Sequence, residues 1–363
     1  MKKNKNYVDL KDQPVPEGQH LLVVDDLKMY FHTEDGVVRA VDGVSYTLDR
    51  GETLGVVGES GSGKSVTAMT IMGLISMPPG KIEGGDVRYR GRSILEMTEE
   101  EMQHIRGNDI AMIFQDPMTS LNPVYKIGKQ VGEGLRLHRG YSKQEALKRA
   151  TELLDLVGIP EPEKRVNEYP HQFSGGMRQR VMIAMALACD PDILIADEPT
   201  TALDVTIQAQ IIELMQEMQE KNGNAIIMIT HDLGVVADMA DKIMVMYAGR
   251  PVEFGTAEEI FYESRHPYTW GLIRSIPEQA IEEKKPLTPI HGNPPSLMNL
   301  PEGCVFSPRC PYATDKCRKQ RPERVVTESG HYSACHYSGD PEFLKNAPET
   351  SRTRKDSKKG GEA

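Results

Sequence analysis

The chain has 363 residues, of which 39% are hydrophobic and 26% are charged, and its formal net charge at pH 7 is −10. This mixture can bury a core and excludes an intrinsically disordered chain, and the length suggests about two domains or one large domain with an extension. The apolar run from Val181 to Cys189 is too short for a membrane helix, which needs roughly 18 residues. The basic N-terminus lacks the apolar stretch of a secretory signal, so we expect a cytosolic chain. The acidic balance argues against nucleic acid as a partner.

Polar residues dominate both ends, which predicts a disordered N-terminal arm over 1–20 and a disordered tail over 341–363. From Leu21 onward, short β-branched runs such as Val41–Leu48 and Thr53–Val57 predict strands that are joined by tight turns. The spacing of apolar residues becomes helical over Ser65–Leu74. A glycine-rich loop therefore joins a buried strand to a helix.

That loop, Gly58-Glu-Ser-Gly61-Ser-Gly63-Lys64-Ser65, fits the P-loop pattern G-x-x-x-x-G-K-[ST]. Glycines allow backbone N–H groups to turn inward around a polyphosphate at a helix N-terminus. Lys64 can reach the β- and γ-phosphates, and the Ser65 hydroxyl is suited to bind Mg²⁺. The motif stands between a predicted strand and a predicted helix, which is the context that favours nucleotide binding over a chance match.

A second acidic motif follows the apolar run Ile193–Ala196, which predicts a buried strand. Asp197 would emerge at the carboxyl end of this strand, where ligands bind in open α/β sheets, and could hold Mg²⁺ through water. Glu198 could orient or deprotonate an attacking water. The helical pattern of 207–220 and the apolar run Ala225–Ile229 complete a strand, helix and strand unit of a parallel sheet.

Between these motifs lies Phe173-Ser174-Gly175-Gly176-Met177-Arg-Gln-Arg180. With this loop in place, the chain resembles the nucleotide-binding subunits of ABC transporters, specifically the oligopeptide/dipeptide importer type, over about residues 21–335. The resemblance implies an α/β P-loop NTPase core of the RecA-like type, with an inserted helical subdomain, an antiparallel β subdomain and a cysteine-containing extension. The implied boundaries are 21–265 for the ATPase domain, about 116–178 for the helical subdomain and 266–340 for the extension.

The same resemblance implies further site residues. Gln115 would sense Mg²⁺ and water, and His231 would contact the γ-phosphate. Phe31, with Tyr30 as the alternative, would stack on adenine. Ser174 and Gly176 would cap the γ-phosphate bound by a second subunit, and Asp204 would communicate across that dimer. The implied catalytic set is Glu198, His231 and Gln115, and the implied nucleotide and Mg²⁺ set is Phe31, Gly58, Ser60, Gly61, Gly63, Lys64, Ser65, Gln115, Ser174, Gly176, Asp197 and Asp204.

The resemblance also implies an ATPase that powers peptide import from the cytoplasmic face of a membrane. Its partners would be a second, homologous ATPase in a heterodimer, two membrane-spanning permease subunits and an external peptide-binding protein. The alternative is a soluble ABC-type ATPase that acts on DNA or ribosomes. Only 110 positions separate Lys64 from Ser174, which leaves no room for a long coiled coil, and a single cassette is found. The loop of residues 173–180, which we call the signature loop, and His231 disfavour a P-loop kinase or GTPase.

Four of the five cysteines, Cys304, Cys310, Cys317 and Cys335, lie near the C-terminal end of the chain. In a reducing compartment such a cluster indicates a metal site more often than disulfides. Four thiolates can ligate a [4Fe–4S] cluster, which some members of the resembling family carry, while the lack of a C-x2-C pair makes zinc less favoured. Zinc, with His336 as a substitute ligand, and four free thiols remain the alternatives. Cys189 is expected to be a small buried apolar residue.

Overall fold

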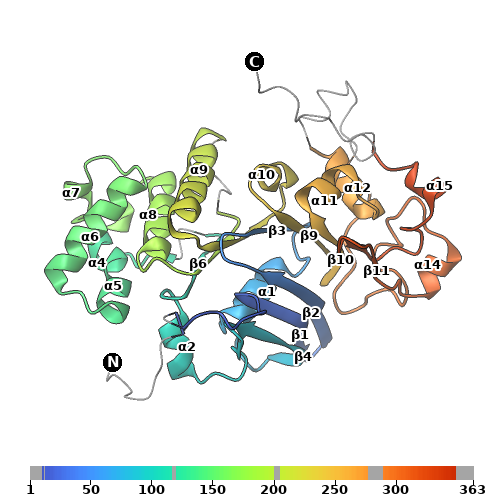
Figure 1. Ribbon diagram of the computed structural model, residues 1–363, viewed down its shortest axis with the longest axis horizontal. Helices are drawn as coiled ribbons and strands as arrows, with labels where there is room; N and C mark the ends of the chain where they lie inside the picture. The colour runs from blue at the N-terminus through green and yellow to red at the C-terminus, as the bar shows by residue number, and fades with distance from the viewer. Residues whose placement is uncertain (1–9, 12, 117–119, 200–204, 277–288, 349–363) are drawn as a thin grey trace.

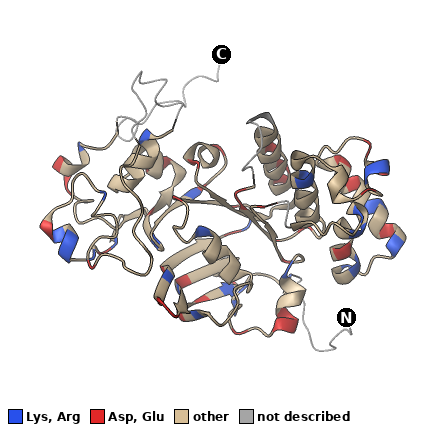
Figure 2. Cartoon of the chain, turned by 180° about the vertical axis from the view of Figure 1, so that it is seen from behind, with Lys and Arg blue, Asp and Glu red and all other residues tan. Residues whose placement is uncertain are grey.

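The computed structural model describes residues 10–11, 13–116, 120–199, 205–276 and 289–348. Two β-sheets occupy its centre, with a group of helices at one end and the C-terminal segment at the other (Figure 1). In the described part of the chain, no helix is long and apolar enough to cross a bilayer. Figure 2 shows Lys and Arg residues interspersed with Asp and Glu along the helices of the first end.

The larger sheet has eight strands and supplies the edge at which the P-loop begins. The five strands on one side of this sheet are parallel, and four of them are buried along their whole length. Such strands are covered on both faces, which explains their continuous apolar sequences. In spatial order the strands are β11 (Val325–Val326), β12 (Tyr332–Ser333), β10 (Arg250–Thr256), β9 (Lys242–Tyr247), β3 (Thr53–Val57), β8 (Ala225–Thr230), β7 (Ile193–Asp197) and β6 (Ile110–Ile113).

The smaller sheet has four strands and is antiparallel. Its strands in spatial order are β2 (Gly36–Leu48), β1 (Leu22–Thr33), β4 (Gly80–Tyr89) and β5 (Arg92–Ser93). Leu22, Val24, Leu27 and Met29 of β1 are buried and belong to the same apolar cluster as Leu54 of β3. The two sheets therefore share one core.

Helices cover the sheets and form a separate group at one end of the molecule. Ser142 begins α6 with a capping box in which its hydroxyl accepts from Glu145 N–H, and the Glu145 carboxylate accepts from Ser142 N–H. The helices near the sheets are α1 (Lys64–Ile71), α2 (Glu99–Ile105), α9 (Val205–Asn222), α10 (Leu233–Ala237) and α11 (Ala257–Tyr262). The inserted group comprises α4 (Ile127–Val131), α5 (Glu133–His138), α6 (Lys143–Leu156), α7 (Pro162–Arg165), the 3-10 helix η1 (Pro170–Gln172) and α8 (Gly175–Leu187).

The C-terminal segment is built on the edge of the large sheet. Strand β12 pairs with β10, so this segment is hydrogen-bonded to the large sheet. Its helices are short, in keeping with its many prolines. Within its described residues they are α12 (Pro267–Arg274), α14 (Asp315–Lys319) and α15 (Pro341–Leu344).

Parts of both chain ends pack against the fold, whereas the sequence predicts that they are disordered. Leu10 is buried, and Arg90 donates to the Gln13 carbonyl. At the other end Ala347 is buried, and Arg274 donates to the Asn346 carbonyl over 2.8 Å. Polar segments can therefore be attached to the surface through a few apolar side chains and hydrogen bonds.

A buried carboxylate, Asp192, joins the two sheets. Its Oδ2 atom accepts from the Tyr89 hydroxyl at 2.6 Å and pairs with the Arg90 guanidinium at 2.5 Å, while Oδ1 pairs with Arg50 at 2.8 Å. Burial alone would raise the pKa of Asp192, but the hydrogen bonds from Tyr89 and Arg90 outweigh burial and leave that pKa below its ordinary value. The ionised carboxylate therefore stabilises the packing of the small sheet on the large one.

Replacing Asp192 by Asn should lower the free energy of unfolding at pH 7 by about 3 kcal/mol, because Arg90 would then be buried without a counter-ion. Since the folded pKa of Asp192 is depressed, the difference from the wild type should stay constant from pH 7 to 5. It should shrink only when the pH falls below the ordinary carboxyl pKa, about 3.9, and through the folded value. Urea unfolding at several pH values measures both effects, and a difference that shrinks above pH 5 would contradict this role of the pair.

Candidate active site

The P-loop, residues 58–65, connects β3 to α1 in the middle of the parallel strands. Gly58, Gly61 and Gly63 all have positive φ angles, of 155°, 76° and 101°. A side chain at Gly58 would clash with the Met246 carbonyl, and one at Gly63 would clash with the Ala40 carbonyl. Glycine is thus required at these two positions by close backbone contact as well as by conformation.

Lys64 is the first residue of α1, and its ammonium group lies inside the P-loop. Its Nζ atom donates to the Gly58 carbonyl over 2.7 Å and to the Glu59 carbonyl over 3.0 Å. Burial lowers the pKa of Lys64, and the carboxylates of Glu198, Asp197 and Glu59 act against that shift. The ammonium is therefore held where it could contact a phosphate group in the loop.

Ser65 and Asp197 meet as the sequence predicts. The Ser65 hydroxyl donates to Asp197 Oδ1 over 2.9 Å, and Asp197 ends the buried strand β7. Burial raises the pKa of Asp197, with Ser65 and Lys64 acting against the shift and Glu198 adding to it. A hydroxyl and a carboxylate oxygen side by side are the kind of ligands that Mg²⁺ uses together with substrate phosphates and water.

Glu198, Gln115 and His231 are brought together at the carboxyl ends of three neighbouring strands. Gln115 Nε2 donates to Glu198 Oε2 over 2.9 Å, and His231 Nδ1 lies 3.3 Å from Glu198 Oε1. Glu198 has a φ of 47° and its N–H donates to the Ile229 carbonyl over 2.9 Å. A non-glycine residue in this region of φ is uncommon, and here it directs the carboxylate toward its two partners.

The two aromatic candidates on β1 have different surroundings. The Tyr30 hydroxyl donates to Asp42 Oδ1 over 2.9 Å, so its ring is tied to a carboxylate that also pairs with Arg250. Phe31 is half-buried and packs against the apolar cluster that the two sheets share. Phe31 therefore has the apolar face that stacking on a base requires.

The signature loop lies apart from the other predicted residues in this single chain. Ser174 is the N-cap of α8, where its hydroxyl accepts from the Met177 N–H over 3.3 Å, and Gly176 lies in the first turn. Among the residues that the structure describes, no hydrogen bond joins Ser174 or Gly176 to the P-loop. Asp204 is outside the described residues.

Two groups that contact the P-loop were not predicted from the sequence. Arg309 pairs with the Glu59 carboxylate, and the Tyr268 hydroxyl accepts from the Glu59 N–H. Both belong to the C-terminal segment, far from the P-loop in sequence, and neither lies in a nucleotide-binding motif. No sequence signal links them to Glu59.

The four C-terminal cysteines line one cavity of about 20 Å³, together with His336. Burial raises the pKa of the Cys310 thiol to about 11 and that of Cys335 to about 12, and it also raises the pKa of Cys304. Within the described residues, no group of three or more His, Cys, Asp or Glu side chains is arranged to hold a metal ion. The thiols thus converge as the spacing suggests, without forming a ligand set.

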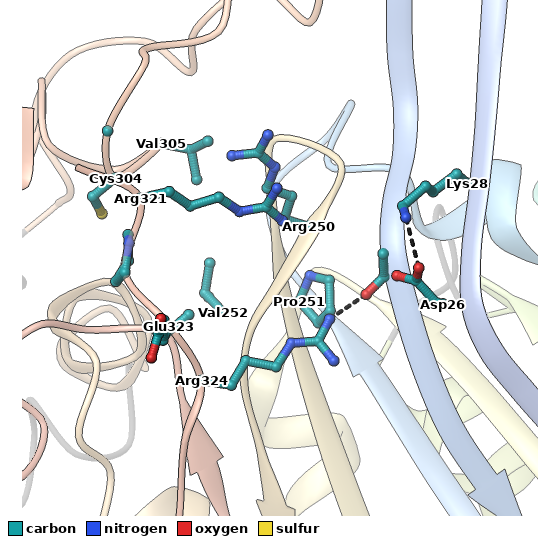
Figure 3. Close-up of a pocket in the computed structure, with 14 residues that line it drawn as sticks. Asp26, Lys28, Arg250, Pro251, Val252, Cys304, Val305, Arg321, Glu323 and Arg324 are labelled. Atoms are coloured by element: carbon teal, nitrogen blue, oxygen red, sulfur yellow. Dashed lines mark hydrogen bonds and ion pairs between the residues drawn. The ribbon is translucent and has the colours of Figure 1, made fainter. Parts of the chain in front are cut away.

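A larger cavity, of about 460 Å³, lies between the small sheet and the C-terminal segment (Figure 3). The Arg250, Arg321 and Arg324 side chains line it, with Lys28 paired to Asp26 at its rim. The P-loop does not line this cavity, so hydrogen-bond geometry and not cavity size identifies the candidate active site.

A third hollow, of about 530 Å³, is mostly apolar, and Phe114, which precedes Gln115 in the sequence, lines it. Leu74 and Phe114 are 42% and 37% exposed there. The residues that line it are Met72, Leu74, Arg106, Gly107, Ala111, Met112, Phe114, Ser120, Met182, Met185 and Ala186, and we call it the apolar groove.

Comparisons with known proteins agree with this geometry. The ABC transporter family matches residues 41–201, and the family described as the oligopeptide/dipeptide transporter C-terminal region matches residues 252–317. The oligopeptide transport ATP-binding protein OppD of Bacillus subtilis (strain 168) is 58% identical over 312 residues, which are 86% of this chain and 87% of that protein. The dipeptide transport ATP-binding protein DppD of Escherichia coli (strain K12) is 52% identical over 320 residues, which are 88% and 97% of the two chains.

A solved structure extends the comparison to the fold. The dimeric, post-hydrolysis structure of the ATP-binding cassette MJ0796 with ADP and Pi covers 65% of this chain and 98% of that chain, with 29% identity and a TM-score of 0.59. The P-loop NTPase fold and the resemblance inferred from the motifs are both confirmed. The chain therefore belongs to the ABC transporter family of ATPases, in the group that carries the oligopeptide/dipeptide transporter C-terminal region.

Proposed function

We propose that this chain hydrolyses ATP at the P-loop site to power the import of peptides through a membrane transporter. The observation that carries the proposal is the meeting of Lys64, the Ser65–Asp197 pair and the Glu198 cluster at one edge of the parallel sheet. The transport names of its relatives support a peptide as cargo. The match of residues 252–317 favours transport over a soluble ATPase that acts on nucleic acid or ribosomes.

The loop and the first turn of α1 would bind the triphosphate. Backbone N–H groups at a helix N-terminus attract anions, and the Lys64 ammonium would move from the carbonyls of its own loop to the β- and γ-phosphates. Mg²⁺, when bound, would neutralise phosphate charge, and Ser65, Asp197 and Gln115 are the residues suited to hold it. Phe31 would stack on the adenine ring.

Glu198 would act as the base in hydrolysis. A water oxygen attacks the γ-phosphorus while Glu198 accepts the water proton, and the bond to the β–γ bridging oxygen breaks to release ADP and phosphate. Gln115 holds the carboxylate from one side and His231 from the other, so the base has a fixed orientation. His231 would in turn contact the γ-phosphate.

Replacing Glu198 by Gln should reduce the steady-state ATPase rate of the assembled transporter about 100-fold or more, because the amide cannot accept the proton. ATP binding should be preserved, since the P-loop is unchanged. Phosphate release and retention of radiolabelled ATP measure the two effects. Glu342→Gln, at a carboxylate on α15 that is 78% exposed, is the matched control. A rate that is unchanged in the Glu198 variant would remove Glu198 from the mechanism.

A second cassette would complete the site. The N-terminus of α8, with Ser174 and Gly176, is suited to receive a γ-phosphate, and in this chain it does not contact the P-loop. We therefore propose that it caps the ATP of a homologous partner in a heterodimer, across which Asp204 would communicate. The solved cassette MJ0796 is itself described as dimeric, which supports this arrangement.

The apolar groove would receive the membrane partners. It is lined by Phe114, which precedes Gln115 in the sequence, and by Met182, Met185 and Ala186 in the C-terminal half of α8. A helical segment of a permease subunit that packs there would contact α8 and the residue before Gln115, so domain closure could be transmitted to the membrane. The chain would then act as a peripheral subunit on the cytoplasmic face of the membrane, together with two permease subunits and an external peptide-binding protein.

Leu74→Asp should weaken co-purification with the permease subunits about tenfold or more, because a charge would be buried in the apolar groove. ATP binding by the isolated chain should be unchanged. The matched control is Val326→Asp on β11, at a valine that is 61% exposed and outside the groove. Equal recovery of the permease with both variants would contradict the proposed docking surface.

The four cysteines would hold a metal centre of structural role. An iron–sulfur cluster supplies strong bonds to four thiolates and would fix loops that have little core of their own. The converging thiols suit such a centre chemically, but a cavity of about 20 Å³ would have to widen for a four-iron cluster, and zinc is the smaller alternative. Raised pKa values mean that metal binding must displace thiol protons.

Anaerobically purified protein should contain about four iron atoms and four acid-labile sulfides per chain and absorb near 400 nm. Cys310→Ser should lose this absorbance and unfold at a lower temperature, whereas Cys189→Ser, at a buried cysteine outside the cavity, should keep it. Zinc without iron would favour a zinc site, in which His336 could replace one cysteine as a ligand. Neither metal in fresh protein would show that the cysteines are free thiols.

A further inference from the structure

The C-terminal segment contacts the P-loop directly through an ion pair. Arg309 Nη1 lies 2.5 Å from Glu59 Oε2, and Arg309 Nη2 donates to Glu59 Oε1 over 3.0 Å. Two parallel N–H···O bonds fix both the distance and the orientation of the two groups. Hydrogen bonding to Glu59 raises the pKa of Arg309, so the guanidinium remains charged at any physiological pH.

The Arg309 side chain is only 5% exposed and is anchored on three further sides. Its Nε atom donates to the His291 carbonyl over 2.9 Å, and Nη2 donates to the Ile290 carbonyl over 3.2 Å. Nη1 also lies 3.3 Å from the Tyr247 hydroxyl. The guanidinium is therefore held by two backbone carbonyls and the Tyr247 hydroxyl as well as by Glu59.

The backbone of Glu59 is held from the same direction. Its N–H donates to the Tyr268 hydroxyl over 2.9 Å, and Tyr268 is fully buried. The Tyr268 ring packs against Tyr247 and Phe306, with centroids 4.6 and 5.3 Å away. The Glu59 backbone thus contacts Tyr268, and the Glu59 side chain contacts Arg309. We call the group formed by Tyr247, Tyr268, Phe306 and Arg309 the clamp.

The position of Glu59 gives this clamp an electrostatic consequence. Glu59 is the second residue of the P-loop, and its carbonyl accepts from the Lys64 ammonium, the group that would contact the phosphates. An unpaired carboxylate at this position would repel a polyphosphate, and with its side chain only 29% exposed, solvent would screen that repulsion incompletely. Pairing with Arg309 cancels the charge and fixes the loop at the same time.

We propose that Arg309 is a positioning residue for the nucleotide, through which the C-terminal segment neutralises Glu59 so that the P-loop can receive ATP phosphates. The inference rests on the proposed role of the P-loop. It assigns to a residue of the C-terminal segment a part in ATP affinity, in addition to any role in holding the fold together.

The test measures the dissociation constant of Mg-ATP for the full-length chain, by competition with a fluorescent ATP analogue. Arg309→Gln should weaken binding about tenfold, because Glu59 is left unpaired beside the phosphates. The double variant Glu59→Gln, Arg309→Gln should recover binding to within about threefold of the wild type. Raising the salt concentration should also reduce the defect of the single variant, since salt screens the repulsion.

Recovery of ATP binding in the double variant distinguishes the proposal from a purely structural contact. If the contact were only structural, each of the two substitutions would weaken ATP binding further. In the assembled transporter Arg309→Gln should raise the KM for ATP about tenfold and leave kcat unchanged. If Arg309→Gln does not fold, Arg309→Lys keeps the charge without the bidentate fork and should bind ATP within about threefold of the wild type. Tenfold weaker binding by a folded Lys variant would overturn the electrostatic part.

Lys64→Ala distinguishes failure of this inference from failure of the site itself. If Lys64→Ala loses ATP while Arg309→Gln binds like the wild type, the clamp is overturned and the P-loop role stands. If Lys64→Ala also binds like the wild type, the phosphate site is elsewhere and both proposals fail. A double variant that is as weak as Arg309→Gln alone would likewise overturn the clamp.

Discussion

The site depends on close contact between backbone segments around the P-loop. Gly58 lies against the carbonyl of Met246 in β9, and Gly63 lies against the carbonyl of Ala40 in β2. Gly249 N–H donates to the Ser62 carbonyl over 3.0 Å, and Asp42 N–H donates to the Gly249 carbonyl over 2.7 Å. The loop is therefore shaped by strands of both sheets, so its form depends on the packing of the small sheet against the large one.

The three residues proposed for catalysis share a simpler constraint, the direction of the parallel strands. Gln115 follows β6, Glu198 follows β7 and His231 follows β8, and these strands are adjacent in the sheet. Their carboxyl ends meet at one edge, so three residues that are far apart in sequence lie within hydrogen-bond distance. The left-handed backbone of Glu198 is maintained by its N–H bond to Ile229 on the neighbouring strand. The sheet thus orients the carboxylate as well as placing it.

Local patterns predicted the parts of this arrangement that local physics determines. The strands β3, β7 and β8 are continuous apolar runs because both of their faces are covered, and the glycine spacing of the P-loop reflects backbone crowding that only glycine tolerates. The four apolar residues of β6 were not predicted as a strand, although they form a run as long as Ile193–Ala196. A contact between residues 250 positions apart, such as that between Glu59 and Arg309, cannot be predicted from apolar runs or from glycine spacing. The roles of individual residues and the domain boundaries remain predictions.

Three carboxylates, Asp42, Asp192 and Asp197, show how the groups around a buried carboxylate set its pKa. Burial disfavours ionisation at all three, yet arginines hold the pKa of Asp42 and that of Asp192 below the ordinary value. Asp197 accepts instead from the neutral Ser65 hydroxyl, and its pKa is raised. A carboxylate that is buried without an arginine is costly to ionise until a cation arrives, and a divalent cation beside a triphosphate supplies that charge. The fold therefore neutralises Asp42 and Asp192 with its own arginines, whereas Ser65 and Lys64 do not offset burial at Asp197, the proposed Mg²⁺ ligand, where a bound cation would lower the cost of ionisation.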